Sequence, residues 1–179
     1  MSPLKPKISF KENKDLYLKI EKEIKKLNNS FVKVGVTEAK GAKKHPGNTK
    51  RNKKSPIQPP SVVQVAFWNE FGTRDDPNRE RPFLRTSFDQ NRSFLNSEID
   101  KELEAILMGQ ITVRKALKSV GFKAKTKVVE TIDRALSWAR KLAPSTVKAK
   151  SKGSLRGPNQ PLIDSGRLRS SIDFEVKVK

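Results

Sequence analysis

The sequence predicts an α+β fold, in which a small antiparallel or mixed sheet is covered by two or three amphipathic helices, with long basic loops. Two short segments, 31–37 and 172–178, alternate apolar and polar residues as half-buried strands do. Three longer segments, 8–27, 84–108 and 113–142, repeat apolar residues at helical spacing. Because the sheet has one face for a core and one for water, the middle helices must cover its apolar face.

The ends of the middle helices carry local signals. The helix over 84–108 is expected to break or kink at Gly109–Gln110, and Thr112 or its neighbour is suited to cap the next helix, over 113–142. Gly121 lies within that second helix, where glycine costs about 1 kcal/mol relative to alanine. The sequence therefore predicts two long helices in succession.

Length and composition limit the organisation of the chain. With 179 residues we expect an N-terminal tail and helix, 1–30, followed by one α+β domain, 31–179. Only 34% of the residues are hydrophobic, so part of the apolar surface is expected to await a partner subunit. Cysteines are absent, which excludes disulfides and thiolate metal sites. No apolar run approaches the roughly 18 residues of a membrane span, so no membrane partner is expected.

The net charge of +20 predicts a polyanionic partner, with nucleic acid the first candidate. Much of the excess lies in two turn-rich stretches, a loop insert at 38–60 and a linker at 143–160, which cannot form a core. We expect these stretches to contact either DNA phosphates, without recognising particular bases, or acidic surfaces of neighbouring proteins. The alternative is that they are solvated loops without a partner. The residues predicted to make these contacts are Lys40, Lys43, Lys44, Lys50, Arg51, Lys53, Lys54, Lys148, Lys150 and Lys152.

The chain is organised around residues 61–88, SVVQVAFWNEFGTRDDPNRERPFLRTSF. An apolar run opens this stretch as an amphipathic helix, which Gly72 is suited to end because glycine readily takes a left-handed conformation. A charged loop follows, and Pro82 suits the start of the next helix. From residue chemistry alone, an ordinary helix–loop–helix core element is the simpler interpretation.

A second segment, PLIDSGRLRSSI, occupies residues 161–172. Asp164 is suited to cap a short helix over 166–171, because a carboxylate accepts hydrogen bonds from the exposed N–H groups of a first turn. The strand at 172–178 follows directly. Taken alone, the segment is interpreted as a capped turn with a structural purpose.

The two segments together resemble a family of phage neck and tail-completion proteins. In that family a helix ending in NEFGT, a short loop and RPFLR are followed, near the C-terminus, by a segment like PLIDSGRLRSSI. The resemblance covers roughly 61–179, makes 31–37 a candidate for the family's first strand, and leaves out the basic insert, which departs from the family pattern. The residues that it implies in the fold and in subunit contacts are Asn69, Glu70, Phe71, Gly72, Thr73, Arg81, Pro82, Phe83, Leu84, Asp164, Gly166, Arg167 and Leu168.

The resemblance implies a structural virion protein that completes or terminates the tail and joins it to the head connector. It would assemble in the host cytoplasm and reside in the neck or tail of the virion. Such proteins work as rings, and a hexameric ring would match the symmetry of the tail. The expected partners are therefore further copies of the chain, the tail-tube protein and the head–tail connector proteins, with non-specific contact to genome DNA.

The sequence offers no catalytic constellation. It has no phosphate-cradling glycine loop and no nucleophile motif, and its only histidine, His45, has no cysteine or acid near it in sequence. Asp75, Asp76 and Glu80 alternate with arginines, so local ion pairs are a better interpretation than a Mg²⁺ site. We expect no enzyme activity and no cofactor.

A basic nucleic-acid-binding protein, nucleoid-like or RNA-binding, is the alternative function. The charge alone argues for it, and it predicts a monomer or dimer with tight, salt-sensitive binding. The neck interpretation predicts a ring with modest DNA binding. Charge does not separate the two, because both use it.

Overall fold

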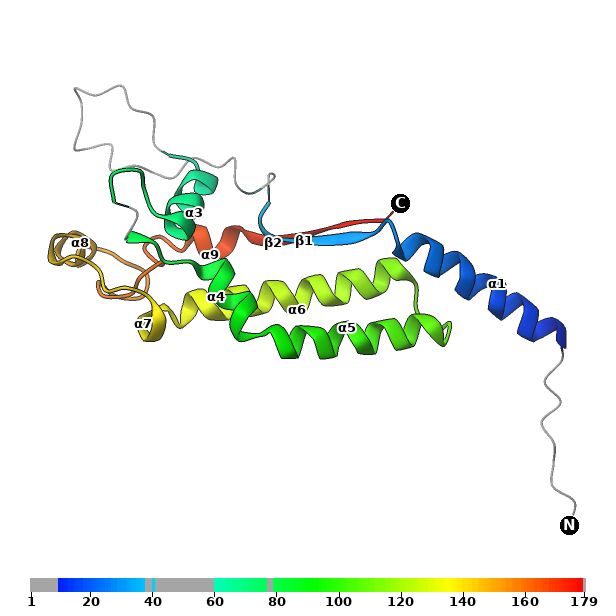
Figure 1. Cartoon of the computed structure of the whole chain (residues 1–179). Helices are drawn as coiled ribbons and strands as arrows, with labels where there is room; N and C mark the ends of the chain where they lie inside the picture. Colours follow the sequence, from blue (N-terminus) through cyan, green and yellow to red (C-terminus); the bar gives the residue numbers. More distant parts are fainter. Residues whose placement is uncertain (1–9, 38–39, 41–59, 77–78, 179) are drawn as a thin grey trace, which may run out of the picture.

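The structure, a computed structural model, describes residues 10–37, 40, 60–76 and 79–178. It confirms an α+β fold, with eight helices and a two-stranded antiparallel sheet in this part of the chain (Figure 1). The elements in chain order are α1 Phe10–Leu27, β1 Phe31–Val36, α3 Val62–Phe71, α4 Phe83–Gln90, α5 Arg92–Leu107, α6 Val113–Asp133, α7 Ala135–Trp138, α8 Pro144–Lys150, α9 Arg167–Ser171 and β2 Ile172–Lys177.

The sheet joins the two strands that the alternating pattern predicts. Phe31 lies opposite Lys177 at one end of the ribbon, and Val36 lies opposite Ile172 at the other. The ribbon runs along α6, and α5 packs beside α6 as the second arm of a helical hairpin (Figure 1). The expectation that a middle helix covers the apolar face of the sheet is confirmed.

Gly121 explains how closely the ribbon approaches α6. A Cβ atom at this position would lie 2.5 Å from Cδ2 of Phe174 and 2.8 Å from Cγ2 of Val32. Both distances are shorter than side chains tolerate, so the glycine leaves room for one residue of each strand. The propensity cost that the sequence shows at Gly121 is therefore offset by packing of the sheet.

Replacing Gly121 by alanine is expected to destabilise the fold by about 1–3 kcal/mol, although alanine is the better helix former, because overpacking outweighs the gain in propensity. Urea unfolding followed by circular dichroism measures the change. Lys118→Ala, at an exposed position of the same helix, is the control and is expected to change stability by less than about 0.5 kcal/mol. A stabilised Gly121→Ala variant would contradict the close packing of ribbon and helix.

The predicted helix over 84–108 is wrong as one element, because α4 and α5 are separated at Asn91. The backbone there leaves helical geometry, with φ −113° and ψ 14°. The carbonyl of Ser87 accepts both the backbone N–H of Asn91, at 3.1 Å, and its side-chain Nδ2, at 2.8 Å. A side chain that competes for a helical carbonyl in this way favours a bend.

The predicted helix over 113–142 is also too long. Thr112 caps its start as expected, by accepting the N–H of Lys115, but α6 ends at Asp133. The buried side chain of Gln160 donates to the carbonyl of Asp133 at 3.2 Å. Gln160 thus satisfies a carbonyl at the end of α6, and α7 and α8 follow as separate short helices, the latter within the stretch predicted to be a linker.

The core lies where α3, α4, α6, α9 and β2 meet. Its buried members are Val62, Ala66, Phe83, Val128, Ile132, Ile163, Leu168 and Ile172. A second, smaller cluster gathers Ile106, Val113 and Ala116 near the turn of the α5–α6 hairpin. There the carboxylate of Glu23, in α1, accepts the N–H of Val113 at 2.8 Å and so helps to cap the start of α6. The rest of α1 extends away from the other elements (Figure 1).

Asp173 connects the sheet to two lysines and makes stability depend on acid. Its carboxylate pairs with Lys40 at 2.6 Å and Lys125 at 2.9 Å, which together lower its pKa to about 2. The pKa of an aspartate in an unfolded chain is about 4. The stabilisation of the fold by charged Asp173 is therefore complete above that pH and is lost as the pH falls towards 2.

We expect Asp173→Asn to reduce the loss of stability between pH 5 and pH 2, a range from about one pH unit above the ordinary aspartate pKa to about two below it. The midpoint of urea unfolding measures this loss. Asp89→Asn serves as the control, because Asp89 is exposed and its ion pair with Arg92 spans 3.4 Å. If both variants lose as much stability between pH 5 and pH 2 as the unaltered chain does, the two lysines do not hold Asp173 in its charged form.

Candidate assembly site

The two segments that resemble tail-completion proteins meet in one core. Val62 and Ala66 come from α3, Phe83 from the start of α4, and Ile163 and Leu168 from the C-terminal segment. Helix α9 lies against α3, although about a hundred residues separate them in sequence (Figure 1). The motif pair is therefore one structural unit at one end of the molecule.

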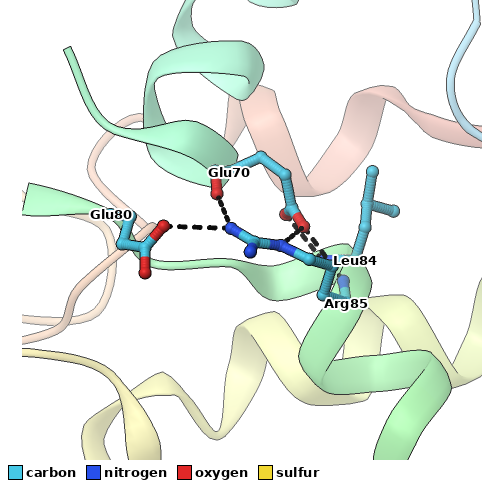
Figure 2. Close-up of polar contacts among 4 residues, drawn as sticks. All are labelled: Glu70, Glu80, Leu84 and Arg85. Carbon is cyan, nitrogen blue, oxygen red and sulfur yellow. Dashed lines mark hydrogen bonds and ion pairs between the residues drawn. The ribbon is translucent and has the colours of Figure 1, made fainter. Parts of the chain in front are cut away.

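Glu70 joins the two halves of the first motif (Figure 2). Its side chain comes from α3 and is buried, and its carboxylate accepts the backbone N–H groups of Leu84 at 2.9 Å and Arg85 at 3.0 Å. These groups belong to the first turn of α4, where Pro82 provides no side-chain cap. The glutamate of NEFGT thus caps the helix that RPFLR begins, as the unpaired N–H groups of a first turn require.

Arg85 closes the same contact from the other side (Figure 2). Its guanidinium pairs with the Glu70 carboxylate at 3.2 Å and with Glu80 at 3.0 Å, and it donates to the Glu70 carbonyl. The ion pairs predicted for the loop acids are confirmed for Glu80 and also for Asp76, which pairs with Arg79 at 2.8 Å. Within the described residues, no three acidic or histidine side chains gather as a metal site would require.

Other residues of the first motif hold the loop between α3 and α4 in place. The carbonyl of Asn69 accepts the N–H of Arg81 at 2.6 Å. Gly72 is buried and has φ 78°, which confirms the need for glycine at the end of α3. Thr73 accepts the N–H of Asp76 through its hydroxyl, and the side chain of Phe83 is fully buried. These positions support the fold.

The capping role predicted for Asp164 is wrong. Gly166 is the N-cap of α9, in a left-handed conformation with φ 74° and ψ 1°, and no side chain caps the helix. This turn separates Asp164 from the helix start, so its side chain is exposed, while its carbonyl accepts the N–H of Leu155 at 2.9 Å. Leu168 is buried in the core, and Arg167 is exposed beside a pocket near Lys40.

The outer face of α3 exposes large apolar side chains. Its buried side consists of Val62, Ala66 and Glu70. The opposite side consists of Val63, Phe67, Trp68 and Phe71, which are 45, 58, 42 and 55% exposed. We call these four residues the α3 face. The prediction of an amphipathic helix is therefore wrong for α3: apolar residues lie on both of its sides, so burying one side leaves the other in water.

The α3 face was not predicted from the sequence as an exposed surface, although Phe71 was included among the expected contact residues. The signal was present in the run VVQVAFW, which lacks helical periodicity in its apolar residues. The rings of Phe67 and Phe71 lie 4.8 Å apart, so they form one contiguous aromatic patch.

A second apolar surface is concave and lies between β1, α5 and α6. Val32 and Val34 of β1 form one wall, Leu95 and Ile99 of α5 form the other, and Val120 contributes to the lining from α6. The groove has a volume of about 310 Å³. It shares no residue with the α3 face.

The basic residues predicted to contact DNA are in different situations. Lys43, Lys44, Lys50, Arg51, Lys53 and Lys54 lie outside the described residues. Lys40 pairs with Asp173, and Lys148 and Lys152 are exposed. Lys150 points into the fold instead: its ammonium group donates to the carbonyls of Gln160 and Ile163, and burial lowers its pKa. It therefore supports the turn before the second motif.

No protein-family model matches the chain, and no curated protein or solved structure matches it either. Among the residues described, no helix is both long enough and apolar enough to cross a membrane. The functional argument accordingly depends on the two motifs and on the geometry of the surfaces around them.

Proposed function

We propose that this chain is a structural virion protein of a tailed phage. It forms a ring in the neck, completes or terminates the tail, and joins the tail to the head connector. The resemblance of the two motifs to tail-completion proteins suggests this role. The observation that carries it is the α3 face, because the motif helix directs its largest apolar side chains into water.

A patch of this kind requires a partner. Single exposed apolar residues are common on soluble proteins, but a contiguous aromatic patch on one helix is typical of an interaction surface. The first motif also holds this helix firmly, since Glu70 on its buried side binds the start of α4. A rigid surface loses less entropy on association than a mobile one.

The partner that we infer is another copy of the same chain. The α3 face is an exposed apolar surface and the groove is a concave one, and the two come from different elements. A contact between two different patches is heterologous, and it produces a closed ring when the rotation between neighbours closes. In the described part of the chain the sheet has two strands, so each strand has one edge without a neighbouring strand, and such edges favour association with another chain.

Native mass spectrometry of the purified chain tests the proposal. We expect a closed ring, either from the chain alone or after addition of the tail-tube protein of the same phage as a template. A chain that stays monomeric or dimeric with tail-tube protein, and that binds short duplex DNA tightly, would overturn the ring. That outcome would favour the nucleic-acid-binding alternative.

A further inference from the structure

The loop that precedes α4 and the segment that joins α7 to α8 lie at the end of the molecule opposite α1 (Figure 1). A basic pocket is lined by residues of both segments. Its volume is about 360 Å³. Four cationic residues line it: Arg79, Arg81, Arg140 and Lys141. The resemblance places only Arg81 among its motif residues, and the sequence shows no reason for the four to lie together.

Arg81 is the most buried of these cations and holds the pocket together. Its guanidinium donates to the carbonyls of Arg140 at 2.9 Å, Lys141 at 3.3 Å and Arg79 at 3.4 Å. All three acceptors are neutral. A guanidinium has five N–H donors, so subtracting these three bonds leaves two donors for another acceptor, as far as the described chain goes.

The surrounding acids do not balance the positive charge. Among the described residues of the lining Asp76 is the only carboxylate, so four cations less one anion leave a net +3 there. Asp76 already pairs with Arg79, and the nearby Glu80 pairs with Arg85 on the other side of the loop. Burial, and then the charges of Arg140 and Arg79, lower the pKa of Arg81. An anion would relieve this accumulation of partly desolvated charge.

We propose that this pocket binds phosphate groups, either free or in the backbone of a nucleic acid. Arginine forks match the oxygens of a phosphate and bind them with strong, charge-assisted bonds. Ser145 and Thr146 line the same pocket and supply hydroxyl donors. The pocket is wide enough for more than one phosphate group, which favours a phosphodiester chain over a single ion.

Helix α8 extends this surface beyond the pocket. Its first turn contributes Ser145 and Thr146, and the exposed Lys148 follows in its last turn. A strand of nucleic acid bound in the pocket would meet further positive charge along that helix. The site does not require ring assembly, so it goes beyond the function proposed above and is tested separately from it.

The test compares two double variants that each remove two positive charges. Arg140→Gln/Lys141→Gln removes two exposed cations of the pocket, whereas Arg114→Gln/Lys118→Gln removes two from exposed positions of α6 outside it. Fluorescence anisotropy measures the Kd for a labelled short duplex DNA over a range of salt concentrations. Calorimetry measures the binding of inorganic phosphate at constant ionic strength, and circular dichroism confirms that both variants fold.

We expect the pocket variant to weaken duplex binding about tenfold or more and to reduce the slope of log Kd against log salt by about 2, since about one counterion is released per contact. The α6 variant is expected to change Kd by less than about threefold. Saturable phosphate binding that only the pocket variant loses would identify free phosphate as a ligand. Duplex binding that only the pocket variant loses, with no saturable phosphate binding by the unaltered chain, would identify the nucleic-acid backbone as the ligand.

Equal weakening by the two variants would overturn the proposal, because it would assign binding to the overall charge. Unchanged binding of both the duplex and inorganic phosphate in the pocket variant would also overturn it, and loss of poly-glutamate binding in that variant would then assign the pocket to an acidic protein. Arg81→Lys adds a further check, since it keeps the charge but removes the fork. We expect it to weaken phosphate and duplex binding while the chain stays folded.

Discussion

Glu70→Ala is expected to destabilise the protein by about 3 kcal/mol, the largest loss that we expect from a single substitution. The change leaves the backbone N–H groups of Leu84 and Arg85 without their acceptor and removes the buried partner of the Arg85 guanidinium. It also removes the side-chain hydrogen bonds that tie α3 to the start of α4, so the α3 face is held less firmly. Urea unfolding followed by circular dichroism measures the free energy of unfolding.

Two further variants separate the helix-capping role of Glu70 from an ordinary ion pair. Glu70→Gln keeps one oxygen acceptor at the start of α4 and is expected to lose roughly half as much stability. Glu80→Ala removes the other, more exposed partner of Arg85 and is expected to cost less than about 1 kcal/mol. If Glu70→Ala costs no more than Glu80→Ala, the carboxylate does not cap α4.

Phe67→Ser/Phe71→Ser is expected to convert the proposed ring into monomers. Both rings are more than half exposed, so their loss removes little from the core of a single chain but removes the centre of the α3 face. The monomer is expected to lose less than about 1 kcal/mol, including the contact of Arg85 with the Phe71 ring. Native mass spectrometry and sedimentation velocity measure the assembly, and urea unfolding measures the stability.

Phe122→Ser/Leu136→Ser is the matched control for this experiment. It removes two apolar side chains that are 61 and 63% exposed and that lie outside the α3 face and the groove. We expect this variant to assemble as the unaltered chain does. A ring that persists in Phe67→Ser/Phe71→Ser, or that both double variants abolish equally, would remove the α3 face from the interface.

Much of the fold was predictable because its signals are local. The two strands follow from the alternation of their residues, and their pairing from the need for a partner. The cap at Thr112 and the helix end at Gly72 follow from the chemistry of single positions. The helix breaks at Asn91 and Arg134 were missed, because at each of them a side chain takes a carbonyl that the periodic pattern assigns to the helix.

The candidate sites were less predictable than the elements that carry them. The motifs drew attention to Glu70 and Arg81, but the sequence could not show that one caps α4 and that the other assembles a basic pocket. Lys150 looked like its neighbour Lys148, yet it is turned into the fold. Lysine side chains are long enough to serve either use, and only the position of the acceptors selects one.

The sequence by itself determined the kind and order of most elements, because periodicity, caps and turn residues act within a few positions of one another. Only the tertiary structure decided where α6 ends, which side of α3 faces water, and which arginines meet. Those outcomes depend on contacts between distant residues: Glu70 reaches Leu84 across 14 positions, Gln160 reaches Asp133 across 27, and Arg81 reaches Arg140 across 59. Such hydrogen bonds form only after the hydrophobic core has brought α3, α4, α6 and the C-terminal segment together, and no local pattern encodes them.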